Sequence, residues 1–382
     1  MLNFFLFFLG ILLLILLLIY IYIKPYYNVL EKGNFHVFNT DICMDAPTCF
    51  GQNPDSPYAR LIFGDPRGTF TLNKNQAIVI EGISPPPCRY FGFTLYLFRE
   101  GSFIPFASLG DTINNLDIPF NFQFKILVSP SPTITSEIQP NGLVLQVPKC
   151  AMHKGDLLMI VMRTAYFANN NLGMNYLMEM PIRAVKIQRY PPVSKLYDRK
   201  PLYVRATTPD EHIYENEFDR YLAGPLPGTV IQRIPSKPFL YDYNYDSGYT
   251  CIDDHIECLG DNRDATYLLS EPVFLGPNQA LIVKGVNHVN TGKAIYFSQS
   301  LYDEQKQLGL ESFSDEQSGD FNRFYTFAFT RVPIPNFPYP QYIIPPDVQE
   351  VRLAERAYVQ PGSHVGPAPE SLLWPVVFQV QL

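Results

Sequence analysis

Residues 2–23 form an almost wholly apolar run without a single charge. As a helix these 22 residues would extend roughly 33 Å, which exceeds the ~30 Å hydrocarbon core of a bilayer. No basic residue precedes the run and Lys24 follows it, whereas a cleaved signal peptide has a basic start, a shorter apolar stretch and small residues at the cut site. Residues 1–34 therefore predict an uncleaved, single-pass signal-anchor with its juxtamembrane segment.

Beyond residue 34, apolar and polar residues alternate with a period of two over many short runs. In residues 90–98, Phe91, Phe93 and Leu95 would face one side of a strand and their neighbours the other. Clusters of Pro, Gly and Asn separate the runs, as at turns between strands. We expect an all-β fold made of β-sandwich, jelly-roll-like domains.

Three blocks of sequence occur twice in the same order. Residues 49–58 match residues 258–267 at five of ten positions, 75–82 match 278–285 at four of eight, and 90–96 match 296–302 at four of seven. These blocks contain 13 identities in 25 positions, where average residue usage would give roughly one or two by chance. A weaker match follows between the segments that begin at Arg163 and Arg356. The pattern predicts a tandem duplication of about 150 residues.

The duplication divides the chain into two predicted repeats, residues 35–190 and 241–382. The connection between them, residues 191–240, is rich in Pro and Gly but contains one predicted helix. Thr208 would cap this helix, Pro209 would occupy its first position and Gly224 would end it. Its apolar face is expected to pack between the two repeats.

Composition narrows the classes of protein to consider. Hydrophobic residues make up 47% of the chain and charged residues 17%, which is enough apolar material for a core and too little charge for a disordered chain. The 29 Lys and Arg against 36 Asp and Glu give a net charge of −7, which argues against a nucleic-acid binder. The expected partners are the membrane, through residues 2–23, and a protein or glycan.

Six cysteines indicate disulfide bonds, because their number is even and two pairs are close in sequence. The expected bridges are Cys43–Cys49 and Cys251–Cys258, which leaves Cys88 and Cys150 to pair within the first repeat. This is one of fifteen connectivities and depends on the symmetry of the duplication. Spacings of five and six residues within the close pairs are looser than those of structural zinc sites.

The two indicators of membrane orientation conflict. Lys24 and Lys32 follow the anchor and favour a cytoplasmic C-terminal part, whereas the cysteines favour an oxidising compartment. No Asn-x-Ser/Thr sequon supports a glycosylated domain. Giving more weight to the cysteines, we expect the C-terminal part to be extracytoplasmic or on a virion or cell surface.

Four acidic residues close together in the second repeat suggest a metal site. Asp253, Asp254, Asp261 and Asp264 offer the oxygen ligands that Ca²⁺ prefers, although their spacing is not that of an EF-hand. The elements common to both repeats, however, are the Asn and Asp of Asn262-x-Asp264. These residue types shape turns by bonding to their own backbone, and this explanation requires no ion.

His288 is the candidate catalytic base, because it lies in a predicted hairpin loop whose counterpart in the first repeat has no His. A base needs an orienting carboxylate, for which Asp261 or Asp264 are the candidates. Sequence drift in a surface loop would equally explain why only the second repeat has a histidine at this position. Arg163 and Arg356 are each expected to form an ion pair in the core, and the tyrosines that follow them are expected to be buried. Motifs for phosphate loops, zinc proteases, serine hydrolases and dinucleotide binding do not occur.

The leading hypothesis is a single-pass, membrane-anchored, non-enzymatic binding or structural protein, such as a component of a cell surface or virion membrane. The residues kept between the repeats are of types that shape a fold, which favours this interpretation. The alternative is a membrane-tethered hydrolase or metal-dependent enzyme with one active copy in the second repeat. That enzyme would use His288, Asp261 and Asp264.

Overall fold

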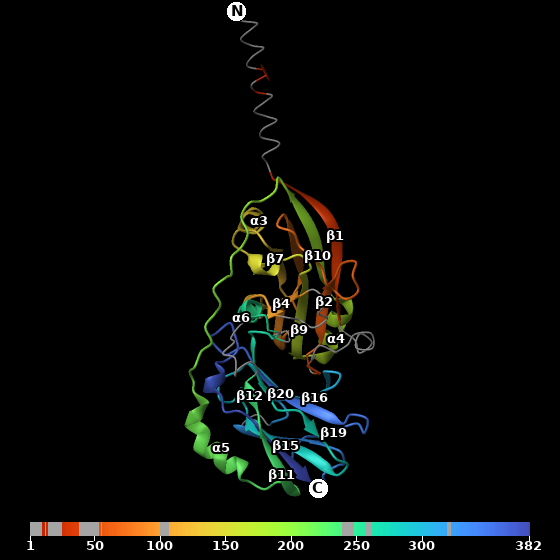
Figure 1. Ribbon diagram of the computed structural model, residues 1–382, viewed down its shortest axis with the longest axis vertical. Helices are drawn as coiled ribbons and strands as arrows, with labels where there is room; N and C mark the ends of the chain where they lie inside the picture. Colours follow the sequence, from red (N-terminus) through yellow and green to blue (C-terminus); the bar gives the residue numbers. More distant parts are fainter. Residues whose placement is uncertain are drawn as a thin grey trace, which may run out of the picture.

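The computed structural model describes residues 10, 11, 13, 25–37, 53, 54, 56–99, 107–238, 248–256, 258, 261–318 and 322–382. It is mostly β, which confirms the expected fold class (Figure 1). Nearly all of the predicted anchor, residues 2–23, lies outside the described part, as do Cys43 and Cys49. Of the helices in the described ranges, none has the length and hydropathy needed to span a bilayer.

Residues 26–190 form one sheet with the strand order β5-β4-β9-β2-β1-β10-β3-β7-β8, in which β6 also pairs with β4. All neighbours are antiparallel except β7 and β8. The strands are β1 (Tyr26–Val37), β2 (Tyr58–Ile62), β3 (Gln76–Ile83), β4 (Cys88–Phe98), β5 (Ala107–Ser108), β6 (Ile113–Asn114), β7 (Gln123–Ser129), β8 (Leu143–Gln146), β9 (Leu157–Phe167) and β10 (Ile182–Tyr190).

The second half of the chain contains two sheets, with the orders β11-β21-β15-β18-β19 and β12-β13-β20-β16-β17, and β14 also pairs with β20. The strands are β11 (Thr229–Pro235), β12 (Lys237–Pro238), β13 (Ala265–Leu269), β14 (Val273–Phe274), β15 (Gln279–Val286), β16 (Tyr296–Asp303), β17 (Leu308–Ser314), β18 (Phe324–Thr330), β19 (Gln341–Ile343), β20 (Glu350–Tyr358) and β21 (Val376–Gln381).

The strands of the two halves pair in the same order. The path β1-β10-β3-β7-β8 in the first half corresponds to β11-β21-β15-β18-β19 in the second, and both paths end in a parallel pair. The path β2-β9-β4 likewise corresponds to β13-β20-β16. A difference lies in the first strand: β1 pairs with both β10 and β2, whereas β11 and β12 divide these roles on either side of Ser236.

Strand β4 has both faces buried. Phe91, Phe93 and Leu95 point into the main core of the first half, which also contains residues from β3, β7 and β9. Tyr90 and Tyr96, on the other face, belong to different buried clusters. The cluster around Tyr90 includes Tyr296 and Tyr358 of the second half, so the outer face of β4 contributes to the contact between the halves.

From residue 25 onward, the helices in the described ranges are short and lie between strands. They are α3 (Pro132–Ile138), α4 (Asn170–Glu179), α5 (Glu215–Leu222) and α6 (Gly248–Asp254), with the short 3-10 helices η1 (Lys149–Ala151), η2 (Glu211–Tyr214) and η4 (Pro369–Ser371).

The predicted helix in the connection exists as η2 and α5, but its cap and its packing differ from expectation. Asp210, and not Thr208, caps it by accepting a hydrogen bond from the His212 amide at 3.0 Å. Phe218 and Leu222 pack against the outer face of β15, β18 and β21. The small side chains Ala280 and Ala328 on that face leave room for the helix, which therefore lies on the second half and not between the halves (Figure 1).

Helix α6 joins the two halves. It follows the connection in sequence, yet Tyr249, Cys251 and Ile252 are buried in the main core of the first half. Gly248 lies so close to β5 that an added Cβ would be 2.1 Å from the Ser108 carbonyl oxygen. Figure 1 accordingly shows α6 beside the strands of the first sheet. The predicted boundary at residue 241 thus does not separate two independent cores.

Candidate functional site

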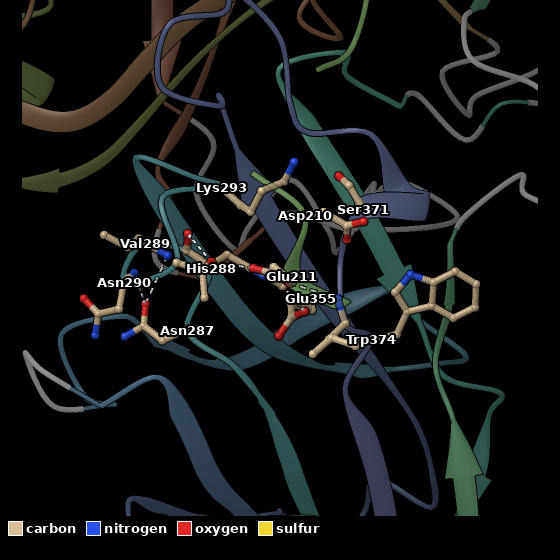
Figure 2. Close-up of polar contacts among 12 residues, drawn as sticks. Asp210, Glu211, Asn287, His288, Val289, Asn290, Lys293, Glu355, Ser371 and Trp374 are labelled. Carbon is tan, nitrogen blue, oxygen red and sulfur yellow. Dashed lines mark hydrogen bonds and ion pairs between the residues drawn. The ribbon is translucent and has the colours of Figure 1, made fainter. Parts of the chain in front are cut away.

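His288 lies in the turn between β15 and β16, where the Asn287 side chain accepts hydrogen bonds from the amides of Val289 and Asn290 at 3.1 and 3.2 Å. The turn directs the imidazole ring into the protein. Its Nδ1 lies 2.8 Å from Glu211 Oε1, and its Nε2 lies 2.9 Å from Glu355 Oε1 (Figure 2). The carboxylates that hold His288 are therefore Glu211 and Glu355.

Both ring nitrogens of His288 donate, because each faces a carboxylate oxygen. His288 is wholly buried, and Glu211 and Glu355 are each 1% exposed. Burial alone would lower the pKa of His288, but attraction to Glu211 and Glu355 outweighs it and raises that pKa to about 10. The ring is therefore a buried imidazolium between two carboxylates.

Further hydrogen bonds satisfy both carboxylates. Glu211 accepts from the Leu373 amide at 2.9 Å and from the Thr291 hydroxyl. Glu355 accepts from the Tyr325 hydroxyl. A catalytic base has to reach a substrate proton, whereas each nitrogen of His288 already has a protein partner. The contacts of His288 thus fix the connection, through Glu211, to the second half.

Asp264 and Asp261 lie away from His288 and contact the first half. Asp264 Oδ2 accepts from the Tyr90 hydroxyl at 2.8 Å and from Asn114 Nδ2 at 3.3 Å. Asp261 Oδ1 accepts from the Ser108 hydroxyl at 3.3 Å. Burial raises the pKa of Asp264 to about 7, against the effect of these hydrogen bonds.

The four acidic residues proposed as a calcium site do not converge. Asp253, at the end of α6, forms an ion pair with Arg199, whereas Asp264 is buried against β4 and β6. Asp254 is exposed. Within the described ranges, no three His, Cys, Asp or Glu side chains are arranged to hold a metal ion.

The repeated asparagines make reciprocal contacts across the halves. Asn53 donates to the Tyr296 hydroxyl at 3.5 Å and to the Ser298 hydroxyl at 3.0 Å. Asn262, at the matching position of the second half, donates to the Tyr90 hydroxyl at 3.4 Å. Because Tyr90 and Tyr296 also occupy matching positions in the sequence, each half uses the same residue types to bind the other.

The cysteines follow the sequence prediction in part. Cys251 and Cys258 form the expected disulfide, with a Cα–Cα distance of 6.0 Å. Cys88 and Cys150 are free thiols, so the expected bridge between them is wrong. Cys88 begins β4, whereas the Cys150 carbonyl accepts from Arg99 just beyond the end of that strand. The length of β4 separates the thiols by roughly 30 Å, far beyond disulfide reach.

Arg163 and Arg356 form a second buried cluster with tyrosines. The sequence predicted that both arginines are buried, but not which rings they contact. Arg163 of β9 lies over the rings of Tyr58 and Tyr96, at 4.7 and 5.3 Å. Arg356 of β20 lies over the rings of Tyr267 and Tyr302, at 5.3 and 5.2 Å. The weak match between the segments containing Arg163 and Arg356 was the signal for this cluster. Glu211 and Glu355 had no comparable signal.

No protein-family model matches the chain, and no curated protein matches it in sequence. Among solved structures, an uncharacterized protein from Burkholderia cenocepacia is similar with a TM-score of 0.50 and 13% identity, over 93% of this chain and 82% of that chain. The VPA0106 protein from Vibrio parahaemolyticus is similar with a TM-score of 0.41 and 10% identity, over 86% of this chain and 90% of that one. At such identity the first likeness concerns the fold alone.

Proposed function

We propose that this chain is a membrane-anchored, non-enzymatic binding or structural protein, in which two duplicated β-sandwich repeats act as one rigid unit. The anchor is residues 2–23, and the expected partner is a protein or glycan. The C-terminal part would lie on the extracytoplasmic side or on a virion or cell surface, where the Cys251–Cys258 disulfide is stable.

The reciprocal contacts of Asn53 and Asn262 support this proposal most strongly. They tie matching positions of the two repeats to each other, and α6 adds side chains of the second half to the first core. Asn53 and Asn262 thus hold the two halves together through their side chains. The common strand order of the two halves supports the duplication.

The enzymatic alternative receives less support from the contacts. It needs His288 beside Asp261 or Asp264, but the described partners of His288 are Glu211 and Glu355. It also needs a histidine that substrate can reach, whereas His288 is wholly buried.

The anchor is tested by expressing the full chain and a variant that lacks residues 1–24 in cells, then washing the membranes with alkaline carbonate. We expect the full chain to stay in the pellet, because 22 apolar residues hold it in the bilayer, and the shortened chain to be soluble. Release of the full chain by the wash would contradict the proposal, as would a shortened chain that remains in the pellet.

A further inference from the structure

Arg163 and Arg356 occupy matching strands of the two halves and act on the same buried tyrosines, Tyr58 and Tyr358. Arg163 lies in β9 opposite Tyr58 of β2, and Arg356 lies in β20 opposite Tyr267 of β13. Arg163 is 4% exposed and Arg356 is 6% exposed. Two guanidinium groups, one from each half, are thus buried.

The charge of Arg163 is not balanced by an ion pair. Its guanidinium donates to the Thr94 hydroxyl at 3.0 Å and to the Tyr96 hydroxyl, but no carboxylate of the described residues lies within ion-pair distance of it. Arg263, buried to the same degree, has Asp111 at 2.7 Å. Burying a charge without an ion pair costs several kcal/mol, so the burial of Arg163 calls for an explanation.

Polar atoms without a partner lie in the same region. Among the described residues, Arg163 Nε and the Tyr358 hydroxyl have no hydrogen-bond partner. The Tyr358 ring is wholly buried, with the rings of Tyr90 and Tyr296 at 4.8 and 5.2 Å. A buried donor without an acceptor is costly, which makes two such donors in one region a signal for a ligand that accepts hydrogen bonds.

The electrostatic environment of the tyrosines shows that these groups share one region. Burial tends to raise the pKa of Tyr58, but Arg163 and Arg356 both oppose it and the net pKa is lowered. The pKa of Tyr358 also responds to both arginines, although burial still raises it. The two arginines therefore act on the same tyrosines, and Arg163 also opposes the rise that burial causes in the pKa of Asp264 nearby.

We propose that this region binds a small oxyanion, the carboxylate of an organic acid or an inorganic phosphate, between Arg163 and Arg356. Guanidinium groups match the two oxygens of such an anion, and the Tyr358 hydroxyl donates to it. The inference goes beyond the proposed function, because it names a ligand and does not depend on the anchor.

The test measures the thermal unfolding midpoint of the full chain in detergent while phosphate or acetate replaces chloride at constant ionic strength. A ligand that binds only the folded state raises the midpoint in a concentration-dependent manner. A rise with phosphate alone supports a phosphate site, and a rise with acetate alone supports a carboxylate site. No rise with either anion would overturn the proposal.

Two variants separate binding from general salt effects, since phosphate stabilises many proteins by exclusion from their surface. Arg163→Gln should abolish the anion-dependent rise, and Tyr358→Phe should weaken the apparent affinity about tenfold, the value of one hydrogen bond to a charged group. Arg67→Gln and Tyr203→Phe, at exposed positions, serve as controls and should respond like the parent chain. Equal rises in all five proteins would overturn the proposal.

The Tyr358 variant keeps the test decisive if Arg163→Gln does not fold, because the Tyr358 hydroxyl has no hydrogen bond to lose with any residue that the structure describes. Ultraviolet absorption tests whether an ionised tyrosine already neutralises the charge of Arg163. A tyrosinate band in the native chain at neutral pH would show that an ionised tyrosine already balances Arg163, and would overturn the proposal.

Discussion

At the scale of single residues, His288 is a candidate catalytic base in the sequence, but in the structure it is a buried cation held by two carboxylates. His288 attracted attention because only one repeat has it, but its partners Glu211 and Glu355 are 77 and 67 residues away in sequence. No local pattern shows that these side chains meet, because the meeting depends on how the connection and β20 pack. Sequence could therefore identify His288 but not its role.

We predict that His288→Gln destabilises the chain by about 3–5 kcal/mol, because it leaves Glu211 and Glu355 buried without a positive partner. Urea unfolding followed by circular dichroism measures the effect. His36→Gln, at an exposed position, is the matched control and should change stability by less than about 0.5 kcal/mol. A neutral effect of His288→Gln would show that the buried cluster does not stabilise the fold.

The raised pKa of Asp264 predicts that the free energy of unfolding depends on pH in the acidic to neutral range. Its pKa rises on folding from 3.8 to about 7, chiefly through burial, so the folded state holds this proton more tightly than the unfolded state. The resulting stabilisation is complete below pH 3.8 and is lost as the pH rises through about 7. Asp264→Asn should therefore flatten the stability profile over this range, measured by urea midpoints. Parallel profiles of parent and variant would contradict this assignment.

At the scale of elements, the period-two runs predicted the strands well because each strand buries at least one face. β4 confirms this, since Phe91, Phe93 and Leu95 share the main core. The cap and the packing of the helix in the connection, residues 191–240, were less predictable. Two residues near its helix, Thr208 and Asp210, can both act as caps, and which sheet receives Phe218 depends on the small side chains of β15 and β18, which lie far away in sequence.

The contact between α6 and β5 yields a prediction about a glycine. Gly248→Ala should destabilise the chain by about 1–3 kcal/mol, because the new methyl group would overlap the Ser108 backbone. Gly64→Ala is the control, since an added Cβ there meets nothing within 4 Å. Thermal unfolding of both variants checks the difference, and equal midpoints would mean that α6 does not pack tightly on β5.

At the scale of the whole molecule, the two halves are interlocked more than their sequence division suggests. The duplicated blocks indicated repeats at 35–190 and 241–382, but they did not indicate that α6 would enter the first core or that Asn53 and Asn262 would cross between the halves. Repeats that arise by duplication can pack side by side or exchange segments, and the repeated sequence is the same in both cases.

The central claim, that the halves fold as one unit, is tested most directly by unfolding the full chain in detergent with urea and following each half separately. Trp374, the single tryptophan, reports on the second half through its fluorescence, and alkylation of Cys88, located by peptide mapping, reports on the first. Interlocked cores predict that the two signals change at the same urea concentration. Two separate midpoints would show that the halves unfold independently and would contradict the account.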